Sequence, residues 1–85
     1  MSVADRIIAM ACEEAGVSPA DVSPRTLVSD LKMDSLSFMD LVMRLEEAEG
    51  VVMGDEEVEK ILGATYLAEI IAIFETARAR TPEVI

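Results

Sequence analysis

The sequence predicts an all-α fold: a small four-helix bundle of three main helices and one short helix, with a long loop between the first and second helices. In four segments, apolar residues recur at the 3.6-residue spacing of amphipathic helices, and glycine or proline follows these segments. The chain is 52% hydrophobic but only 4% aromatic, a composition that suits packed helices. Its 85 residues can build one modest core. We therefore expect a single domain over residues 1–85, with its core in about residues 3–80 and a flexible end at 81–85.

The first helix is expected over residues 3–15. Ser2 followed by Asp5 resembles a helix-start box, in which two side chains bond each other's backbone N–H groups. Gly16 is suited to end the helix, because glycine readily adopts the left-handed conformation that closes many helices. The apolar residues on one face of this helix are Val3, Ile7, Met10 and Ala11.

A long loop is expected over residues 16–34. Pro19 and Pro24, with scattered Ser and Asp, argue against a helix in this segment. A loop of this length is uncommon in a compact domain, so we expect apolar side chains to hold it on the core. These side chains are Val17, Val22, Leu27, Val28 and Leu31.

The second helix is expected over residues 35–49. Asp34 and Ser35 are favourable helix-start residues, and Gly50 ends the helix. Its predicted apolar stripe comprises Leu36, Met39, Val42, Met43 and Leu45.

Two further helices are expected in the second half of the chain. The acidic segment that begins at Asp55 predicts a short third helix. Its inward residues are Val58, Ile61 and Leu62. The fourth helix is expected from Thr65 to about Arg80, before Pro82. Its inward residues are Leu67, Ala68, Ile70, Ile71 and Phe74.

Charge and cysteine content exclude several classes of function. Seventeen acidic against seven basic residues give a formal charge of −10, which repels nucleic acid and attracts partners with Arg or Lys patches. The chain has no His and one cysteine, Cys12. It therefore lacks an internal disulfide, a cysteine-based metal site and the usual base of a Ser or Cys nucleophile. Cys12 lies in an apolar run, which favours a buried structural thiol.

No stretch approaches the about 20 apolar residues that a membrane-spanning helix needs. We expect a cytoplasmic, monomeric protein that is not an enzyme.

The motif Asp34-Ser35-Leu36 points to a specific chemistry. It follows the long loop at the start of an amphipathic helix, where a serine hydroxyl is exposed and the helix dipole tolerates an attached anion. From the residues alone, we favour the interpretation that Asp34 or Ser35 serves only as a helix N-cap. With its length, charge and helix order, the chain resembles the acyl carrier protein family, in one register without a gap from Leu31 to Phe74.

This resemblance implies that Ser35 is the attachment point of 4′-phosphopantetheine, transferred from coenzyme A by a phosphopantetheinyl transferase. It also implies that Asp34 helps the transferase to recognise the site, and that Leu36 packs toward the core or contacts partners. The thiol of the arm would hold an acyl group as a thioester, which the protein delivers. The candidates to shelter the acyl chain are Met39, Val42, Met43, Ile61, Leu67, Ala68 and Ile71.

The resemblance further implies a partner surface. Asp40, Glu46 and Glu47 occupy positions on the second helix where the family carries acidic residues that meet basic patches on acyl-loading and elongating enzymes. Such charges raise association rates and orient docking. The expected extension of this acidic surface comprises Asp55, Glu56, Glu57 and Glu59.

Six positions depart from the family pattern. Lys32 stands where the family commonly has glycine, and Ser37 where it frequently has an acidic residue. Glu49 replaces an aromatic or apolar residue, and Gly54 replaces a proline. Phe38 and Arg44 place a large aromatic ring and a positive charge on or near the recognition helix. Phe38 and Arg44 are residue types that anchor interfaces, so we expect them to tune partner choice. For Phe38, whose exposure we favour, a core role is the alternative.

The sequence thus predicts a freestanding carrier in fatty acid synthesis or in a specialised polyketide or lipid pathway. An unmodified carrier-like regulatory or structural module and a peptidyl or aminoacyl carrier remain as alternatives. A calcium sensor is disfavoured, because the acidic segment at Asp55 lacks the alternating oxygen ligands and 12-residue loop of such a site.

Overall fold

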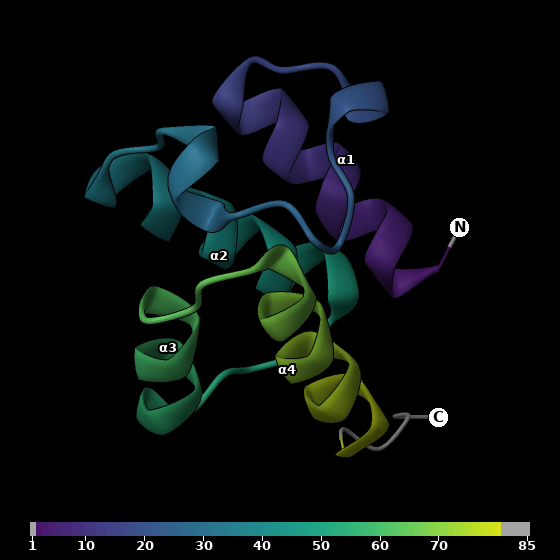
Figure 1. Ribbon diagram of the computed structural model, residues 1–85. Helices are drawn as coiled ribbons and strands as arrows, with labels where there is room; N and C mark the ends of the chain where they lie inside the picture. Colours follow the sequence, from purple (N-terminus) through teal and green to yellow (C-terminus); the bar gives the residue numbers. More distant parts are fainter. Residues whose placement is uncertain (1, 81–85) are drawn as a thin grey trace.

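The computed structural model describes residues 2–80 and shows four helices, α1 to α4 (Figure 1). They are α1 (Val3–Ala15), α2 (Ser35–Glu49), α3 (Asp55–Leu62) and α4 (Leu67–Arg80), with two short 3₁₀ turns, η1 (Pro19–Asp21) and η2 (Val28–Leu31), in the long loop. Within residues 2–80 no β-strand is present, only an isolated antiparallel bridge between Leu27 and Tyr66. The predicted all-α fold is confirmed. The expectation for 81–85 lies outside the described residues.

The ends of the first two helices follow the predicted signals. The Ser2 hydroxyl accepts a hydrogen bond from the Asp5 N–H at 3.1 Å, and the Asp5 carboxylate accepts one from the Ser2 N–H at 3.3 Å. Gly16 and Gly50 adopt left-handed conformations, with φ of 73° and 67°, and so end α1 and α2. The bounds of both helices match those expected from the sequence.

The fourth helix begins at Leu67, two residues later than expected. The reason is a local cap: the Glu69 carboxylate accepts hydrogen bonds from the backbone N–H groups of Thr65 and Tyr66. These two residues therefore form the turn before the helix.

The long loop is fixed to the start of α4 by backbone hydrogen bonds. The N–H of Val28 donates to the Thr65 carbonyl at 2.9 Å, and the N–H of Leu67 donates to the Thr26 carbonyl at 3.0 Å. Leu31 is buried in the core, and Val22 and Val28 pack against it. Leu27 is half-buried and Val17 is 37% exposed, and neither packs against the core cluster.

The core lies between α1, α2 and α4, with α3 packed against α4 (Figure 1). Its fully buried larger side chains are Phe74, Ile7, Leu41, Leu45, Ile61, Leu67, Val42 and Cys12. The expected burial of Cys12 is therefore confirmed. Of the residues expected inside the third and fourth helices, Leu62 and Ala68 are exposed instead.

The predicted stripe of α2 is wrong in part. Leu36 is 83% exposed and Met43 63% exposed, whereas Leu41, which was not expected inside, is buried. The buried face is built from Leu41, Val42, Leu45 and Glu49, spaced at three to four residues. Leu36 and Met43 are seven residues apart and so share another face, about 20° apart on an ideal helix.

Candidate functional site

The start of α2 holds the predicted motif. Asp34 has an extended backbone, and its carboxylate accepts a hydrogen bond from the Ser37 N–H at 2.8 Å. This bond, with a second one from the Ser37 side chain, lowers the pKa of Asp34. Asp34 is therefore the N-cap, and Ser35 is the first helical residue, exposed to solvent. Of the two residues that could have served as the cap, the structure selects Asp34, so capping does not require the Ser35 hydroxyl.

Buried residues on both sides hold this exposed serine in place. Before it, Leu31 is buried and Met33 packs against the core. After it, Phe38 is half-buried and also packs against the core, so the exposure favoured for Phe38 is not confirmed. Leu36 points outward and is 83% exposed. Of the two positions expected for Leu36, the structure shows the outward one.

The acidic residues of α2 do not all lie on one surface. Asp40 and Glu47 are exposed and seven residues apart, on the side that also presents Leu36 and Met43. Glu46 is half-buried, and its carboxylate accepts a hydrogen bond from the Met53 N–H at 3.2 Å. Only two of the three expected acidic residues are thus fully available on this face.

Arg44 lies beside this face and pairs within the chain. Its guanidinium contacts the carboxylates of Glu14 at 3.0 Å and Glu13 at 3.4 Å. These contacts, with that of Glu13 the strongest, raise the pKa of Arg44. Arg44 therefore connects α2 to the end of α1.

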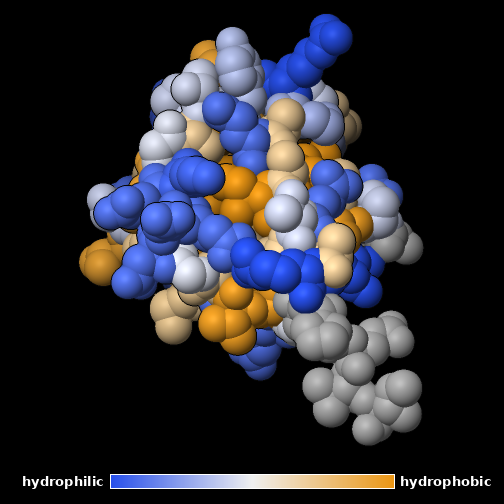
Figure 2. Space-filling model, turned by 90° about the horizontal axis from the view of Figure 1, so that it is seen from below, coloured by the Kyte–Doolittle hydropathy of each residue, from blue (hydrophilic) through white to orange (hydrophobic). Residues whose placement is uncertain are grey.

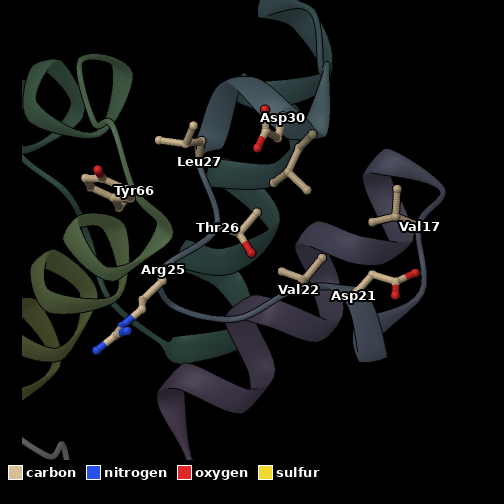
Figure 3. Close-up of a pocket in the computed structure, with 9 residues that line it drawn as sticks. Val17, Asp21, Val22, Arg25, Thr26, Leu27, Asp30 and Tyr66 are labelled. Carbon is tan, nitrogen blue, oxygen red and sulfur yellow. The ribbon is translucent and has the colours of Figure 1, made fainter.

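Most of the residues proposed to shelter an acyl chain are core residues. Val42, Ile61, Leu67 and Ile71 are buried and Met39 is half-buried, but Met43 and Ala68 are exposed and face away from the interior. An open surface groove of about 570 Å³ lies elsewhere, between the long loop and Tyr66 (Figure 3). Its lining residues are Val17, Asp21, Val22, Arg25, Thr26, Leu27, Asp30, Leu31 and Tyr66. None of the proposed acyl-sheltering residues lines this groove.

Gly54, which stands where the family usually has proline, has a local role. Its backbone N–H donates a hydrogen bond to the Glu57 carboxylate at 3.0 Å. Proline has no N–H to donate. The same carboxylate pairs with Arg80, so Glu57 connects the start of α3 to the end of α4.

Two other classes of site find no support in the described part of the chain. Residues 2–80 contain no group of three or more His, Cys, Asp or Glu side chains that could hold a metal ion. Among the same residues, no helix is long and apolar enough to span a bilayer.

An exposed serine on the first turn of a 15-residue helix, with its cap supplied by the preceding aspartate, suits a covalently attached phosphate group. The first turn of α2 contains no acidic residue to oppose that group. A family model described as a phosphopantetheine attachment site matches residues 5–73. The chain is thus a helical domain of the class that holds 4′-phosphopantetheine as its prosthetic group.

Proteins named acyl carrier protein from three strains of Nitratidesulfovibrio vulgaris, Miyazaki F, DP4 and Hildenborough, are each 38% identical to the chain over 63 residues. The match covers 73% of this chain and 83% of each relative. The chain belongs to the acyl carrier protein family, whose members are carriers and not catalysts.

Sequence reasoning missed one element of this site, the outward position of Met43. A signal was available, because Leu36 and Met43 have the same seven-residue spacing as Asp40 and Glu47. Apolar residues that alternate with acidic residues along one side of a helix indicate an exposed face that is both apolar and negatively charged.

Proposed function

We propose that this chain is a freestanding cytoplasmic carrier that holds acyl groups as thioesters on 4′-phosphopantetheine attached to Ser35, and has no enzyme activity of its own. The observation that carries the proposal is the exposed Ser35 hydroxyl on the first turn of α2, left available because Asp34 forms the cap. The pathway is fatty acid synthesis or a specialised polyketide or lipid pathway. The departures at Lys32 and Ser37 favour a specialised set of partners.

The chain's own residues present the attachment site. Ser35 Oγ forms the bond to the phosphorus of coenzyme A as adenosine 3′,5′-bisphosphate leaves and the hydroxyl proton passes to the transferase. The resulting anion stands beside the positive end of the α2 dipole. Leu31 and Phe38, packed on the core before and after the site, keep the start of α2 in a fixed place. The prosthetic group supplies the thiol to which acyl groups are joined.

The partner surface that we propose is the outward face of α2, the docking face, formed by Leu36, Asp40, Met43 and Glu47. Leu36 and Met43 are two of the most exposed large apolar residues described, and a few side chains buried near the centre of an interface contribute most of its binding energy. Asp40 and Glu47 surround them with negative charge, which orients a basic patch on the partner. Candidate partners are the phosphopantetheinyl transferase and acyl-loading and elongating enzymes. Glu46 and Arg44 border the docking face and are partly engaged within the chain.

The proposal is tested by incubating the protein with coenzyme A and a broad phosphopantetheinyl transferase, followed by intact mass spectrometry. Wild type should gain one phosphopantetheine, and Ser35→Ala should gain none while remaining folded by circular dichroism. Ser29→Ala, which changes another exposed serine just before the site, is the matched control and should be modified like wild type. A modified Ser35→Ala variant would contradict the assignment. An unmodified wild type would favour a regulatory or structural module.

A further inference from the structure

Lys32 adopts a backbone conformation that its side chain does not favour. Its φ of 54° and ψ of 33° lie in the left-handed region, and among residues 2–80 it is the one residue other than glycine with a positive φ. The chain uses glycine at the two other positions with this conformation, Gly16 and Gly50. A lysine in this region lowers stability relative to glycine, because its Cβ approaches the following carbonyl oxygen.

The fold gives this lysine side chain no role of its own. The residue's one hydrogen bond given by the structure is from its backbone N–H to the Ser29 carbonyl at 3.2 Å, which a glycine would form equally well. The residue is exposed and is not part of the core cluster. A strained residue whose side chain contributes nothing to packing suggests a function for that side chain.

In the described part of the chain, no carboxylate forms an ion pair with the ammonium group of Lys32. Four arginines form ion pairs with carboxylates, and these are Arg6, Arg44, Arg78 and Arg80. Lys32 forms no ion pair within residues 2–80. Two carboxylates stand two residues away: Asp34 is engaged by Ser37 as the cap of α2, and Asp30 forms no ion pair with Lys32 in the described residues.

Lys32 stands three residues before Ser35, and three residues of extended chain span at most about 11 Å. The flexible lysine side chain from one end and a phosphate on the Ser35 oxygen from the other can together span this distance. Because the first turn of α2 contains no acidic residue, the only charged side chains from 32 to 39 are Lys32 and Asp34.

We propose that Lys32 is a positioning residue whose ammonium group pairs with the phosphodiester of the prosthetic group on Ser35 and holds the base of the arm beside the start of α2. This inference rests on the proposed attachment at Ser35. The pair is exposed to solvent, so it is weakened by salt.

The test is ³¹P NMR of the modified protein at low and high salt, with intact mass spectrometry to verify the arm. Lys32→Gln removes the charge, and Lys32→Arg retains it. Lys60→Gln removes an equally exposed charge on α3 and is the matched control. We expect Lys32→Gln to shift and narrow the phosphodiester resonance, as the arm becomes more mobile, while Lys32→Arg and Lys60→Gln resemble wild type. Added salt should move the wild-type resonance toward that of Lys32→Gln and leave Lys32→Gln nearly unchanged.

A further variant separates positioning from a structural role. Lys32→Gly should raise the urea midpoint of unfolding, because the left-handed strain is relieved, yet its phosphodiester resonance should match that of Lys32→Gln. The inference is overturned if modified Lys32→Gln and wild type give the same resonance at low salt, or if Lys60→Gln changes it equally. If mass spectrometry shows no arm on Ser35 in any of these proteins, the proposed function fails and this inference fails with it.

Discussion

Glu49 is the buried charged residue among those the structure describes, and it stands where the family usually has an aromatic or apolar side chain. Its side chain is fully shielded from solvent and pairs with two arginines: with Arg6 at 2.8 Å from Nη2 to Oε1, and with Arg78 at 2.8 Å from Nη1 to Oε1. These bonds join the end of α2 to α1 and α4. An ion cluster therefore replaces an apolar contact at this point of the bundle.

Removing this carboxylate should destabilise the protein. Glu49→Ala leaves two guanidinium groups without their shared partner, which for fully buried pairs costs about 3–5 kcal/mol. Arg6 and Arg78 have side chains 30% and 51% exposed and can reach water, so we expect a loss of about 1–3 kcal/mol. Urea unfolding measures this loss. The exposed Glu47→Ala on the same helix is the control and should change stability little. Equal effects of the two changes would contradict a structural role for the cluster.

The same cluster predicts a dependence of stability on pH. Hydrogen bonding to Arg6, the largest cause, lowers the pKa of Glu49 below its usual value, against the opposing effect of burial. A carboxylate whose pKa is lower in the folded state contributes stability above its unfolded pKa, near about 4.3. That contribution is lost as the pH falls through the lower folded pKa.

Urea midpoints measured from pH 7 downward should fall more steeply below about pH 4.5 in wild type than in Glu49→Gln. Other carboxylates with lowered pKa, such as Glu57 and Glu69, are common to both proteins, so the difference between the two curves reports Glu49. Parallel curves would show that Glu49 does not contribute.

At the scale of the element, α2 presents different chemistry on its two sides. Its inner side packs Leu41, Val42 and Leu45 into the core, while its outer side is the docking face. The segment between α1 and α2 leads directly into the start of α2: η2 ends at Lys32, which has a left-handed backbone, and Asp34 then caps the helix. The helix thus fixes the proposed attachment site and exposes the surface beside it.

We expect the negative charge of the docking face to steer association with partner enzymes, and reversing one of these charges tests this expectation. Glu47→Lys should slow association with the phosphopantetheinyl transferase in stopped-flow measurements, and added salt should slow wild type more than the variant. Glu75→Lys makes the same change in net charge at an exposed position on α4, outside the expected acidic surface, and is the matched control. If both variants slow association equally, the overall charge of −10 governs the encounter and the docking face does not.

The bounds of α1 and α2 and the motif at Ser35 could be predicted because they depend on local signals: caps, glycines and spacing. The inner side of α2 could not be predicted, because Leu36 and Met43 are as apolar as Leu41 but face outward. Hydropathy alone does not distinguish a core residue from one exposed on a partner surface.

Two other features depend on the folded structure. The Glu49 cluster joins side chains 43 and 29 residues apart in sequence, which no local pattern reveals. The replacement of proline by Gly54 is likewise explained only by the structure, in which the Gly54 N–H donates a hydrogen bond to Glu57.

At the scale of the whole molecule, a few arginines of this acidic protein each join separate elements around the hydrophobic core. Arg44 connects α2 to α1, Arg80 connects α4 to α3, and the cluster at Glu49 connects α1, α2 and α4. On the face seen in Figure 2, hydrophilic side chains surround patches of exposed apolar surface. The bundle is thus a charged scaffold with exposed apolar patches, on which we propose that Ser35 is modified.

The central claim is that this scaffold holds acyl groups as thioesters on a 4′-phosphopantetheine arm attached to Ser35. It is tested most directly by loading the protein from an acyl-coenzyme A with a broad transferase. Intact mass is measured before and after neutral hydroxylamine, which cleaves thioesters but spares the phosphodiester. Wild type should gain the acylated arm and then lose only its acyl part, while Ser35→Ala gains nothing. An acyl mass that survives hydroxylamine, or one that appears on Ser35→Ala, would contradict the account.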